Sequence, residues 1–467
     1  MKMWSGRFGQ PQDPEFERWQ SSFGFDRRLL KYELAASRAH AKALKRAGVL
    51  SASELALVLQ GLEQIEEQAR KSANSLQDET AEDVHHFVEK QLVSFIGDTG
   101  YKLHSGRSRN EQIATDLRLY VRSCIDQLQP AISELIEAFI LRAEQAKNAA
   151  MPAYTHMQRA EPVLVAHWLL AYVEVLFRDL ARLADCRKRM NVCPLGSGAV
   201  AGTTLALDRR AMALELSFDA PSANSMDATT DRDFVLEFAH ALLQLSVHLS
   251  GWAEQMLLFS TQEFGFVRLP EEYSTGSSAM PQKKNPDLLE LTRAKAARVL
   301  GDFTTLATVL HGLPLAYNKD LQETQEPLFD ATETILSLVP LVTGWMKAVE
   351  FDYPRMQEAA RTGNLNAWAA ASYLAERGVP FRLAHERVGN AVRLCVQKNC
   401  ELQDLSLEEF RQFSAEFEQD VYARLSVEGV LALHDIEGGT APARVKNAIA
   451  GAKNRLAALR EEAHAHA

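Results

Sequence analysis

Residues 230–259 read TDRDFVLEFAHALLQLSVHLSGWAEQMLLF, and this stretch is the clearest indication of the fold. Large apolar side chains recur along it at steps of three or four residues, at Phe234, Phe238, Leu242, Leu245, Leu249, Trp252, Met256 and Phe259. Because this spacing is close to the roughly 3.5-residue repeat of a coiled-coil-like seam, we expect one long helix here. Other faces of the same helix are also apolar, at Val235, Leu243, Val247 and Leu257. A helix that is apolar nearly all round lies inside a large core or between subunits. We therefore expect an all-α protein that forms a homo-oligomer.

The chain around this helix divides into three parts. Residues 1–110 mix helical patterns with breaks at glycine, serine and asparagine, and no alternating pattern there predicts a sheet. Residues 111–361 contain several helical stretches of about 20 residues or more, and residues 362–467 return to shorter ones. We expect three helical domains, with a bundle of long helices as the central one.

Composition excludes several classes of function. The 467 residues carry a formal charge of −10 and no basic tract, so nucleic acid is not an expected partner. The five cysteines form no C-x-x-C pair, which indicates buried thiols in a reducing compartment. The first ten residues lack the apolar core of a signal peptide, and the most apolar stretch, residues 162–177, is interrupted by His167 and Glu174. We expect a cytoplasmic protein without membrane contact.

The connection formed by residues 261–284 is long for a helical bundle, and such connections are usually functional or disordered. It ends with residues 274–286, which read STGSSAMPQKKNP. Hydroxyls, two adjacent lysines and a helix N-terminus together suit an anion. A serine beside a lysine could also act as a base, because the cation stabilises its alkoxide. The alternative is a solvated polar loop.

Two further polar segments are candidates for chemistry. Residues 102–110 read KLHSGRSRN, and their arginines, serines and asparagine suit carboxylate recognition, although an ordinary basic turn has the same composition. Residues 154–158 read YTHMQ and lie in a predicted break between two long helices, the second opened by Pro162. His156 could be a general acid or base there, or a structural histidine.

Two other motifs predict no cofactor. Residues 194–202 read PLGSGAVAG but lack the ending of a P-loop and follow no strand, so we expect a tight backbone turn whose amides could still contact substrate. Residues 82–86 read EDVHH and could place two metal ligands on one helix face, but no third ligand is nearby in the sequence. We therefore expect neither a cofactor nor a metal ion.

In this order, the motifs resemble those of the argininosuccinate lyases, a family of the fumarase/aspartase superfamily. The superfamily signature resembles G-S-S-x-M-P-x-K-x-N-P, which residues 276–286 match throughout. Several segments resemble argininosuccinate lyases in particular, namely residues 4–8, 104–110, 155–156, 224–228 and 317–323. The resemblance covers nearly the whole chain and is weakest after about residue 395.

The resemblance implies a fold and a reaction. The fold would be three helical domains, whose central long helices form a core of twenty helices in a homotetramer, with each active site built from three subunits. The reaction would be the reversible β-elimination of argininosuccinate to L-arginine and fumarate, the last step of arginine biosynthesis. It would use no metal or redox cofactor.

The resemblance also implies roles for individual residues. Ser277 would be the base, with Lys283 stabilising both its alkoxide and the carbanion. His156 would be the acid, oriented by Glu290. The opposite assignment, with His156 as the base and Ser277 as the proton donor, stays open. Substrate contacts are implied at Ser22, Ser108, Arg109, Asn110, Thr155, Asn285, Tyr317 and Gln322.

One departure from the family pattern concerns the arginine end of the substrate. Thr324 and Gln325 stand where the family usually has Asp-Lys, and that lysine normally contacts substrate. We expect Gln325 to keep a hydrogen bond but lose a charge.

Two alternative functions stay open. The chain could be another lyase of the superfamily, acting on fumarate, aspartate or adenylosuccinate, or a non-catalytic structural protein similar to the lens crystallins. Residues 317–323 and the tandem lysines favour argininosuccinate lyase over the other lyases. The presence of Ser277, His156, Lys283 and Glu290 argues against an inactive protein.

Overall fold

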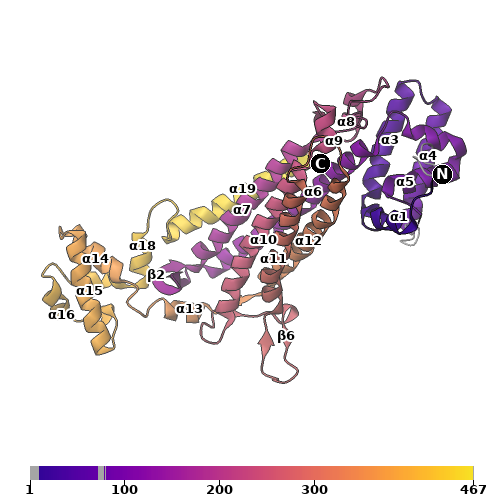
Figure 1. The fold of residues 1–467 in the computed structure, drawn as a ribbon. Helices are drawn as coiled ribbons and strands as arrows, with labels where there is room; N and C mark the ends of the chain where they lie inside the picture. The colour runs from indigo at the N-terminus through magenta and orange to yellow at the C-terminus, as the bar shows by residue number, and fades with distance from the viewer. Residues whose placement is uncertain (1–9, 72–77, 79, 466–467) are drawn as a thin grey trace. The chain divides into compact units, whose positions relative to one another are not determined.

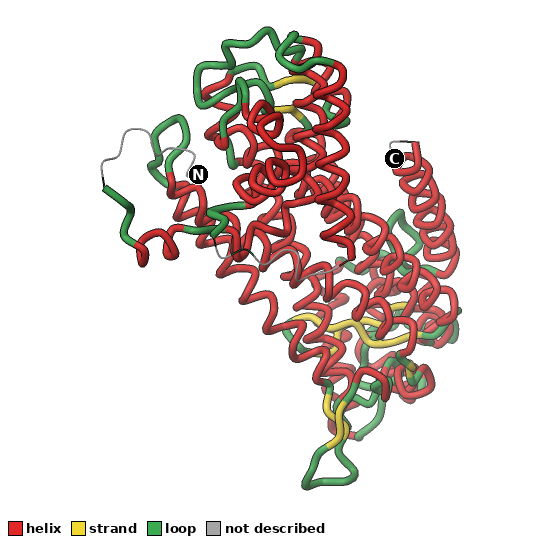
Figure 2. The backbone as a smooth tube through the Cα atoms, turned by 90° about the vertical axis from the view of Figure 1, so that its right-hand side faces the viewer, coloured by secondary structure: helices red, strands yellow, loops and turns green. Residues whose placement is uncertain are grey.

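The computed structural model describes residues 10–71, 78 and 80–465, so the motif at residues 4–8 lies outside the described residues. Helices dominate the chain, as expected, and the strands form only two-stranded pairs (Figures 1 and 2). The chain forms two compact units, one of Met1–Leu128, Ala181–Gln244 and Ala297–Ile335, the other of Gln129–Leu180, Leu245–Ala296 and Leu336–Ala467. We call them the first and the second unit. The long helices contribute to both, and they are α6 (Arg109–Ala146), α7 (Val165–Met190), α10 (Asp233–Ser260), α11 (Asp287–Leu310) and α12 (Gln325–Ala348).

The helix predicted from the apolar seam is confirmed as α10. Every seam residue from Phe234 to Phe259 is buried. The helix begins at Asp233, because Thr230 ends the short helix α9 (Ser225–Thr230) and Asp231 Oδ1 accepts a hydrogen bond from the Asp233 N–H at 2.7 Å. Val247, on another face of α10, is 51 % exposed in the isolated chain. An apolar side chain left open on a long helix is consistent with the expected association.

The break predicted at residues 154–158 is a β-hairpin, and this corrects the expected start of the next helix. Strand β1 (Ala150–Thr155) pairs antiparallel with β2 (Gln158–Leu164), and α7 begins at Val165, three residues after Pro162. Pro152 and Pro162 face each other in the pair. A two-stranded sheet tolerates prolines because each strand keeps an open edge where the missing N–H is not needed.

The described part of the first unit begins with helices that flank the predicted substrate contact Ser22. They are α1 (Pro14–Gln20), α2 (Phe23–Asp26), η1 (Arg27–Leu29), α3 (Leu30–Arg46), α4 (Ala52–Lys71), α5 (Val84–Ile96) and η3 (Gly97–His104). Asp83 caps α5, with its carboxylate accepting the His86 N–H at 2.7 Å. Further along the unit lie β3 (Val192–Cys193), α8 (Arg209–Glu215), β4 (Ala220–Pro221) and η5 (Lys319–Thr324). Strands β3 and β4 pair in parallel.

The second unit holds two more strand pairs and the C-terminal helices. Strand β5 (Val267–Arg268) pairs antiparallel with β8 (Glu350–Phe351), and β6 (Thr275–Gly276) with β7 (Lys284–Asn285). The remaining elements are η4 (Glu271–Tyr273), α13 (Tyr353–Ala359), α14 (Ala367–Glu376), α15 (Phe381–Lys398), η6 (Leu402–Asp404), α16 (Leu407–Phe413), α17 (Val421–Leu425), α18 (Val427–Leu433) and α19 (Pro442–Ala465).

Helices α14 to α17 enclose a small hydrophobic core of their own. Phe417 lies at its centre, with ring centroids 4.7 Å from Phe410 and 5.9 Å from Tyr373. This core is consistent with a C-terminal helical domain, whose boundaries stay a prediction. Across the described part of the chain, no helix combines the length and the apolar character needed to cross a bilayer.

Candidate active site

The predicted site residues fall into two sets, one in each unit. The second unit holds the expected catalytic residues and two substrate contacts, namely Thr155, His156, Ser277, Lys283, Asn285 and Glu290. The first unit holds the other substrate contacts, namely Ser22, Ser108, Arg109, Asn110, Tyr317 and Gln322.

His156 occupies the two-residue turn of the β1–β2 hairpin. Both turn residues have positive φ, +52° at His156 and +59° at Met157, which is the pattern of a type I′ turn. This turn matches the twist of the strands, but residues other than glycine adopt it rarely, so the tip is strained. Thr155 and His156 are exposed, and among the described residues nothing forms a hydrogen bond or ion pair with the His156 imidazole. The hairpin therefore presents an exposed imidazole that has no hydrogen-bond or ion-pair partner among the described residues.

The base of this hairpin is firmly attached to its unit. Arg159 Nη1 donates to Thr362 Oγ1 at 2.8 Å and to the Ala359 carbonyl at 3.2 Å. The Tyr154 ring packs against Phe264 with centroids 5.7 Å apart. These contacts fix the two strands, and the fixed strands stabilise the strained turn between them. A cavity of about 980 Å³ lies beside the hairpin, and its lining includes Tyr154, Met157, Arg159, Phe264, Arg355 and Glu358.

Ser277 lies at the start of the tip of a second hairpin, β6–β7, which stands away from the helices of its unit (Figures 1 and 2). At its base, Thr275 Oγ1 donates to Asp287 Oδ2 at 2.6 Å. At its tip, Ser277 Oγ accepts the N–H of Met280 at 3.1 Å and that of Ala279 at 3.2 Å. Two amide donors aimed at one hydroxyl oxygen stabilise negative charge on it. This geometry suits a serine that must lose its proton.

The two adjacent lysines have different surroundings. Lys284 Nζ pairs with Glu271 Oε1 at 3.1 Å. The Lys283 side chain is exposed and has no hydrogen-bond or ion-pair partner among the described residues, although its backbone N–H donates to the Met280 carbonyl at 3.0 Å. Lys283 is therefore the ammonium group available to Ser277 or to a bound anion.

Glu290 lies in the first turn of α11 and is exposed. The expected contact between Glu290 and His156 is not seen, and among the described residues no hydrogen bond joins His156 to Ser277 or Lys283. His156, Lys283 and Glu290 are exposed on their own elements, whereas Ser277 is half-buried in the hairpin tip. Their convergence at one site stays a prediction.

In the first unit, Ser22 is buried and held by a carboxylate. Its Oγ donates to Asp26 Oδ2 at 2.6 Å, and its N–H donates to the Glu82 carbonyl at 2.9 Å. Asp26 Oδ1 accepts the Val84 N–H at 3.0 Å, so Asp26 links Ser22 to the start of α5. Burial raises the pKa of Asp26 to about 7. Sequence patterns gave no reason to select Asp26.

The start of α6 packs against the glycine-rich segment 194–202. Glu111 joins them, because one of its oxygens accepts the Ser108 N–H at 3.1 Å and the other accepts the Gly198 N–H at 2.8 Å. Asn110 Nδ2 donates to the Ala199 carbonyl at 3.1 Å. The tight backbone turn predicted for this segment is confirmed, with positive φ at Gly196, Gly198 and Gly202.

Arg109 and the EDVHH motif are engaged with each other. Arg109 Nη1 lies 3.2 Å from both Glu82 Oε2 and Asp83 Oδ2. His85 turns away from them and contacts Glu33 instead. The motif therefore caps α5 and orients Arg109.

Tyr317 and Gln322 follow α11 in the first unit. Gln322 is buried, and its Nε2 donates to the Gln20 carbonyl at 3.2 Å, which brings it to the segment that carries Ser22. Burial raises the pKa of Tyr317. Gln325, at the start of α12, is buried, and its Oε1 has no hydrogen-bond partner within the described residues.

Family comparisons identify the class of protein. A family described as "Lyase" matches residues 6–301, and one described as "Argininosuccinate lyase C-terminal" matches residues 364–432. A solved structure of EDDS lyase in complex with formate aligns with a TM-score of 0.87 at 27 % identity, covering 98 % of this chain and 93 % of that one. Fold and sequence thus define a lyase of the fumarase/aspartase superfamily.

Curated relatives identify the family within this class. The argininosuccinate lyase of Koribacter versatilis (strain Ellin345) is 56 % identical over 467 residues, which is 100 % of both chains. The argininosuccinate lyase of Acidobacterium capsulatum is 56 % identical over 464 residues, covering 98 % of this chain and 96 % of that one. The chain belongs to the argininosuccinate lyase family.

Proposed function

We propose that the protein catalyses the reversible β-elimination of argininosuccinate to L-arginine and fumarate, the last step of arginine biosynthesis. Membership of the family supports the substrate. The observation that carries the chemistry is the Ser277 hydroxyl, which accepts two backbone N–H groups. The same hairpin presents the Lys283 ammonium, which is exposed and has no partner among the described residues.

In the proposed reaction, the Ser277 alkoxide takes a proton from Cβ of the succinyl part. The two amide donors and Lys283 lower the free energy of that alkoxide. The electron pair left on carbon is held as an aci-carboxylate, whose added charge requires cations and N–H donors already in place. The pair then forms the double bond of fumarate as the C–N bond breaks, and His156 protonates the leaving guanidino nitrogen. One proton is removed and one is supplied.

The opposite assignment, with His156 as the base and Ser277 as the donor, has the same proton balance. Deuterium exchange separates the two. In D₂O, a variant that lacks the acid but keeps the base can introduce deuterium at Cβ of argininosuccinate without cleaving it. Exchange by Ser277→Ala would make His156 the base, and exchange by His156→Asn would make Ser277 the base.

For substrate binding, we propose that Ser108, Arg109 and Asn110 hold the succinyl carboxylates with Thr155 and Asn285. The arginine end would contact Ser22, Tyr317 and Gln322. The anchoring of Asn110 to Ala199 and of Arg109 to Asp83 supports the first part, because preorganised donors lose little entropy on binding.

We further propose a homotetramer with a core of twenty helices and active sites shared between subunits. Two observations support this. The expected catalytic side chains make no hydrogen bond or ion pair with one another among the described residues, and large apolar side chains are exposed on the long helices, at Val247, Leu291, Leu300 and Leu341. The domains would be residues 1–110, 111–361 and 362–467. The free cysteines, of which four are buried, support the proposal of a reducing compartment such as the cytoplasm.

The proposed function is tested by supplying argininosuccinate and following fumarate by ultraviolet absorbance, with adenylosuccinate and aspartate in parallel. Fumarate from argininosuccinate alone is the expected result. Fumarate from another substrate would favour a different lyase of the superfamily. No fumarate from any of them, in a folded oligomer, would favour the structural protein.

A further inference from the structure

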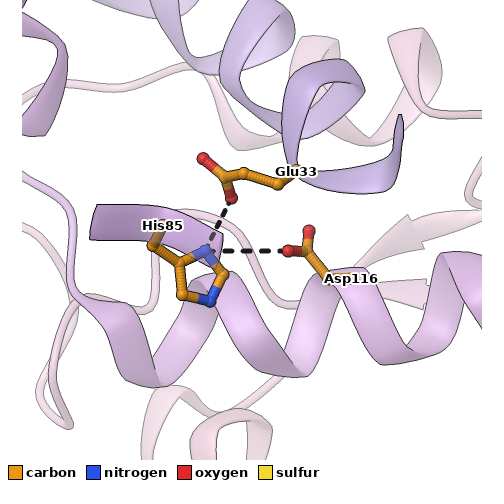
Figure 3. Close-up of side chains that lie close together, drawn as sticks. All are labelled: Glu33, His85 and Asp116. Atoms are coloured by element: carbon orange, nitrogen blue, oxygen red, sulfur yellow. Dashed lines mark hydrogen bonds and ion pairs between the residues drawn. The ribbon is translucent and has the colours of Figure 1, made fainter. Parts of the chain in front are cut away.

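A buried polar cluster lies in the first unit, apart from the predicted substrate contacts. It joins Glu33 of α3, His85 of α5 and Asp116 of α6, and all three side chains are buried (Figure 3). His85 Nδ1 lies 2.9 Å from Glu33 Oε2 and 3.7 Å from Asp116 Oδ2. The three residues are far apart in sequence, so the cluster ties three helices together.

A metal ion is the first possibility for two carboxylates and an imidazole this close. Glu33, however, is already saturated with donors. Ser37 Oγ donates to it at 2.6 Å, and Gln112 Nε2 lies 3.1 Å and 3.2 Å from its two oxygens. Arg107 Nη1 adds a positive charge 3.6 Å from Glu33 Oε1. These donors occupy the oxygens of Glu33, which therefore belongs to a hydrogen-bonded charge network, while the two Asp116 oxygens have no hydrogen-bond partner among the described residues.

Arg107 connects this network to the loop before α6. Its side chain is only 5 % exposed, and Nη1 donates to Ser37 Oγ at 2.8 Å. One turn further along α3, His40 Nε2 lies 3.0 Å from the Ser105 carbonyl. Glu33, Ser37 and His40 share one face of α3, because they are four and three residues apart. Helix α3 therefore holds the loop at two points.

The opposite side of the same loop is also confined. Gly106 has φ of +67°, and a Cβ added there would lie 2.6 Å from Leu205 Cδ1 and 2.8 Å from Thr203 Oγ1. The loop is thus packed between α3 and residues 203–205. These contacts restrict its backbone to one conformation. Its next residues are Ser108, Arg109 and Asn110.

Burying Arg107 requires a nearby negative charge, since an unpaired buried charge is strongly destabilising. Glu33 supplies it. Burial alone would raise the pKa of Glu33, but Arg107 and His85 lower it to about 2, so the carboxylate stays ionised.

We propose that Glu33 is a positioning residue for the substrate loop: by holding Arg107, it fixes the conformation in which residues 108–110 meet the succinyl carboxylates. This inference rests on the proposed function. Glu33 touches neither substrate nor reacting atoms, and it acts through Arg107.

The test is Glu33→Gln, which keeps the shape of the side chain and removes its charge. We expect the KM for argininosuccinate to rise by about tenfold or more, with a much smaller change in kcat, because loop geometry governs binding. Glu33→Asp should recover part of the affinity. The double variant Glu33→Gln/Arg107→Gln should have a KM no higher than that of either single variant, because the two residues act as a pair. A purely structural role would lower the melting temperature and leave the KM of the folded enzyme unchanged.

The matched control is Glu66→Gln. Like Glu33, Glu66 pairs with an arginine: its carboxylate lies 2.5 Å from Arg38 of α3. Glu66 itself lies on α4 and makes no described contact with the loop. Its KM should equal that of the wild type. If Glu33→Gln does not fold, Ser37→Ala removes the hydrogen bond to Arg107 without touching a charge, and it should raise the KM in the same direction.

Hydrogen–deuterium exchange supplies a readout that does not depend on activity. Glu33→Gln should speed exchange of the amides of residues 105–110 and leave α4 unchanged. The absence of fumarate from the wild type would reject the proposed function without affecting this result. Unchanged KM and unchanged loop exchange in a folded Glu33→Gln protein would overturn the inference. So would a stoichiometric divalent metal that is present in the wild type and lost in the variant.

Discussion

The Ser277 hydroxyl oxygen accepts the backbone N–H of Met280 at 3.1 Å. The bond turns the tip of the β6–β7 hairpin back on itself and places a partial positive charge against the atom that would carry the alkoxide.

Ser277→Ala removes the hydroxyl and leaves the hairpin pairs Thr275–Asn285 and Gly276–Lys284 intact. We expect kcat to fall by about 10²- to 10⁴-fold, the usual contribution of a positioned acid or base, with little change in KM. The measurement is steady-state fumarate formation by the purified variant. Full activity in Ser277→Ala would reject both proposed mechanisms, since Ser277 transfers a proton in each.

The adjacent lysines make a matched pair of variants. Lys283→Met should lower kcat by about 10²-fold or more, because it removes the cation that stabilises the alkoxide and the carbanion. Lys284→Met removes an exposed pair with Glu271, which is worth about 0–1 kcal/mol, so its kcat should stay within a few-fold of the wild type. Equal losses in the two variants would contradict the assignment of Lys283.

Stability should depend on pH through His85. Burial alone would lower the pKa of this imidazole, but Glu33, Asp83 and Asp116 raise it from 6.5 to about 9. The folded state therefore holds the proton more tightly than the unfolded state. The resulting stabilisation is complete below about pH 6.5 and is lost as the pH rises through about 9.

Urea unfolding at a series of pH values measures this dependence. His85→Gln should flatten the fall in stability between these pH values. His385→Gln, which changes an exposed histidine, should keep the wild-type profile. An unchanged slope in His85→Gln would show that His85 does not carry this proton.

Substitutions at Gln325 test the effect of having glutamine where the family usually has lysine. Restoring the usual residue with Gln325→Lys should lower the KM for argininosuccinate by about 5- to 30-fold, which corresponds to about 1–2 kcal/mol from a charged hydrogen bond. Gln325→Met is the control for size, since it adds no charge. An unchanged KM in Gln325→Lys would remove residue 325 from the substrate contacts, and an equal fall in both variants would assign the effect to packing.

Much of this fold could be predicted from local pattern. The seam from Phe234 to Phe259 predicts α10 because a helix repeats the same face every three or four residues. The glycine-rich turn at residues 194–202 was predictable for a similar reason, since positive φ favours glycine. The polar signature at residues 276–286 is enough to select Ser277 and Lys283 as candidates from the sequence alone.

Other features were not predictable because their causes are distant in sequence. The β1–β2 hairpin contains two prolines, and its turn residues, His156 and Met157, lack the Asn-Gly signal that such turns usually carry. Its strands are held by Arg159 contacts some 200 residues away in the chain. The cluster of Glu33, His85 and Asp116 likewise arises only when three helices pack together, so spacing along the chain could not reveal it.

Sites shared between subunits would bring His156 and Ser277 together from different copies of the chain, and we propose that they do so. The most direct test is to mix inactive His156→Asn with inactive Ser277→Ala under conditions that exchange subunits, and to measure fumarate formation. If each site draws the two residues from different chains, about a quarter of the sites in an equal random mixture contain both native residues. Recovery of about a quarter of wild-type activity is the predicted result. No recovery, in a mixture shown to contain hybrid oligomers, would mean that both residues come from the same chain and would contradict the account.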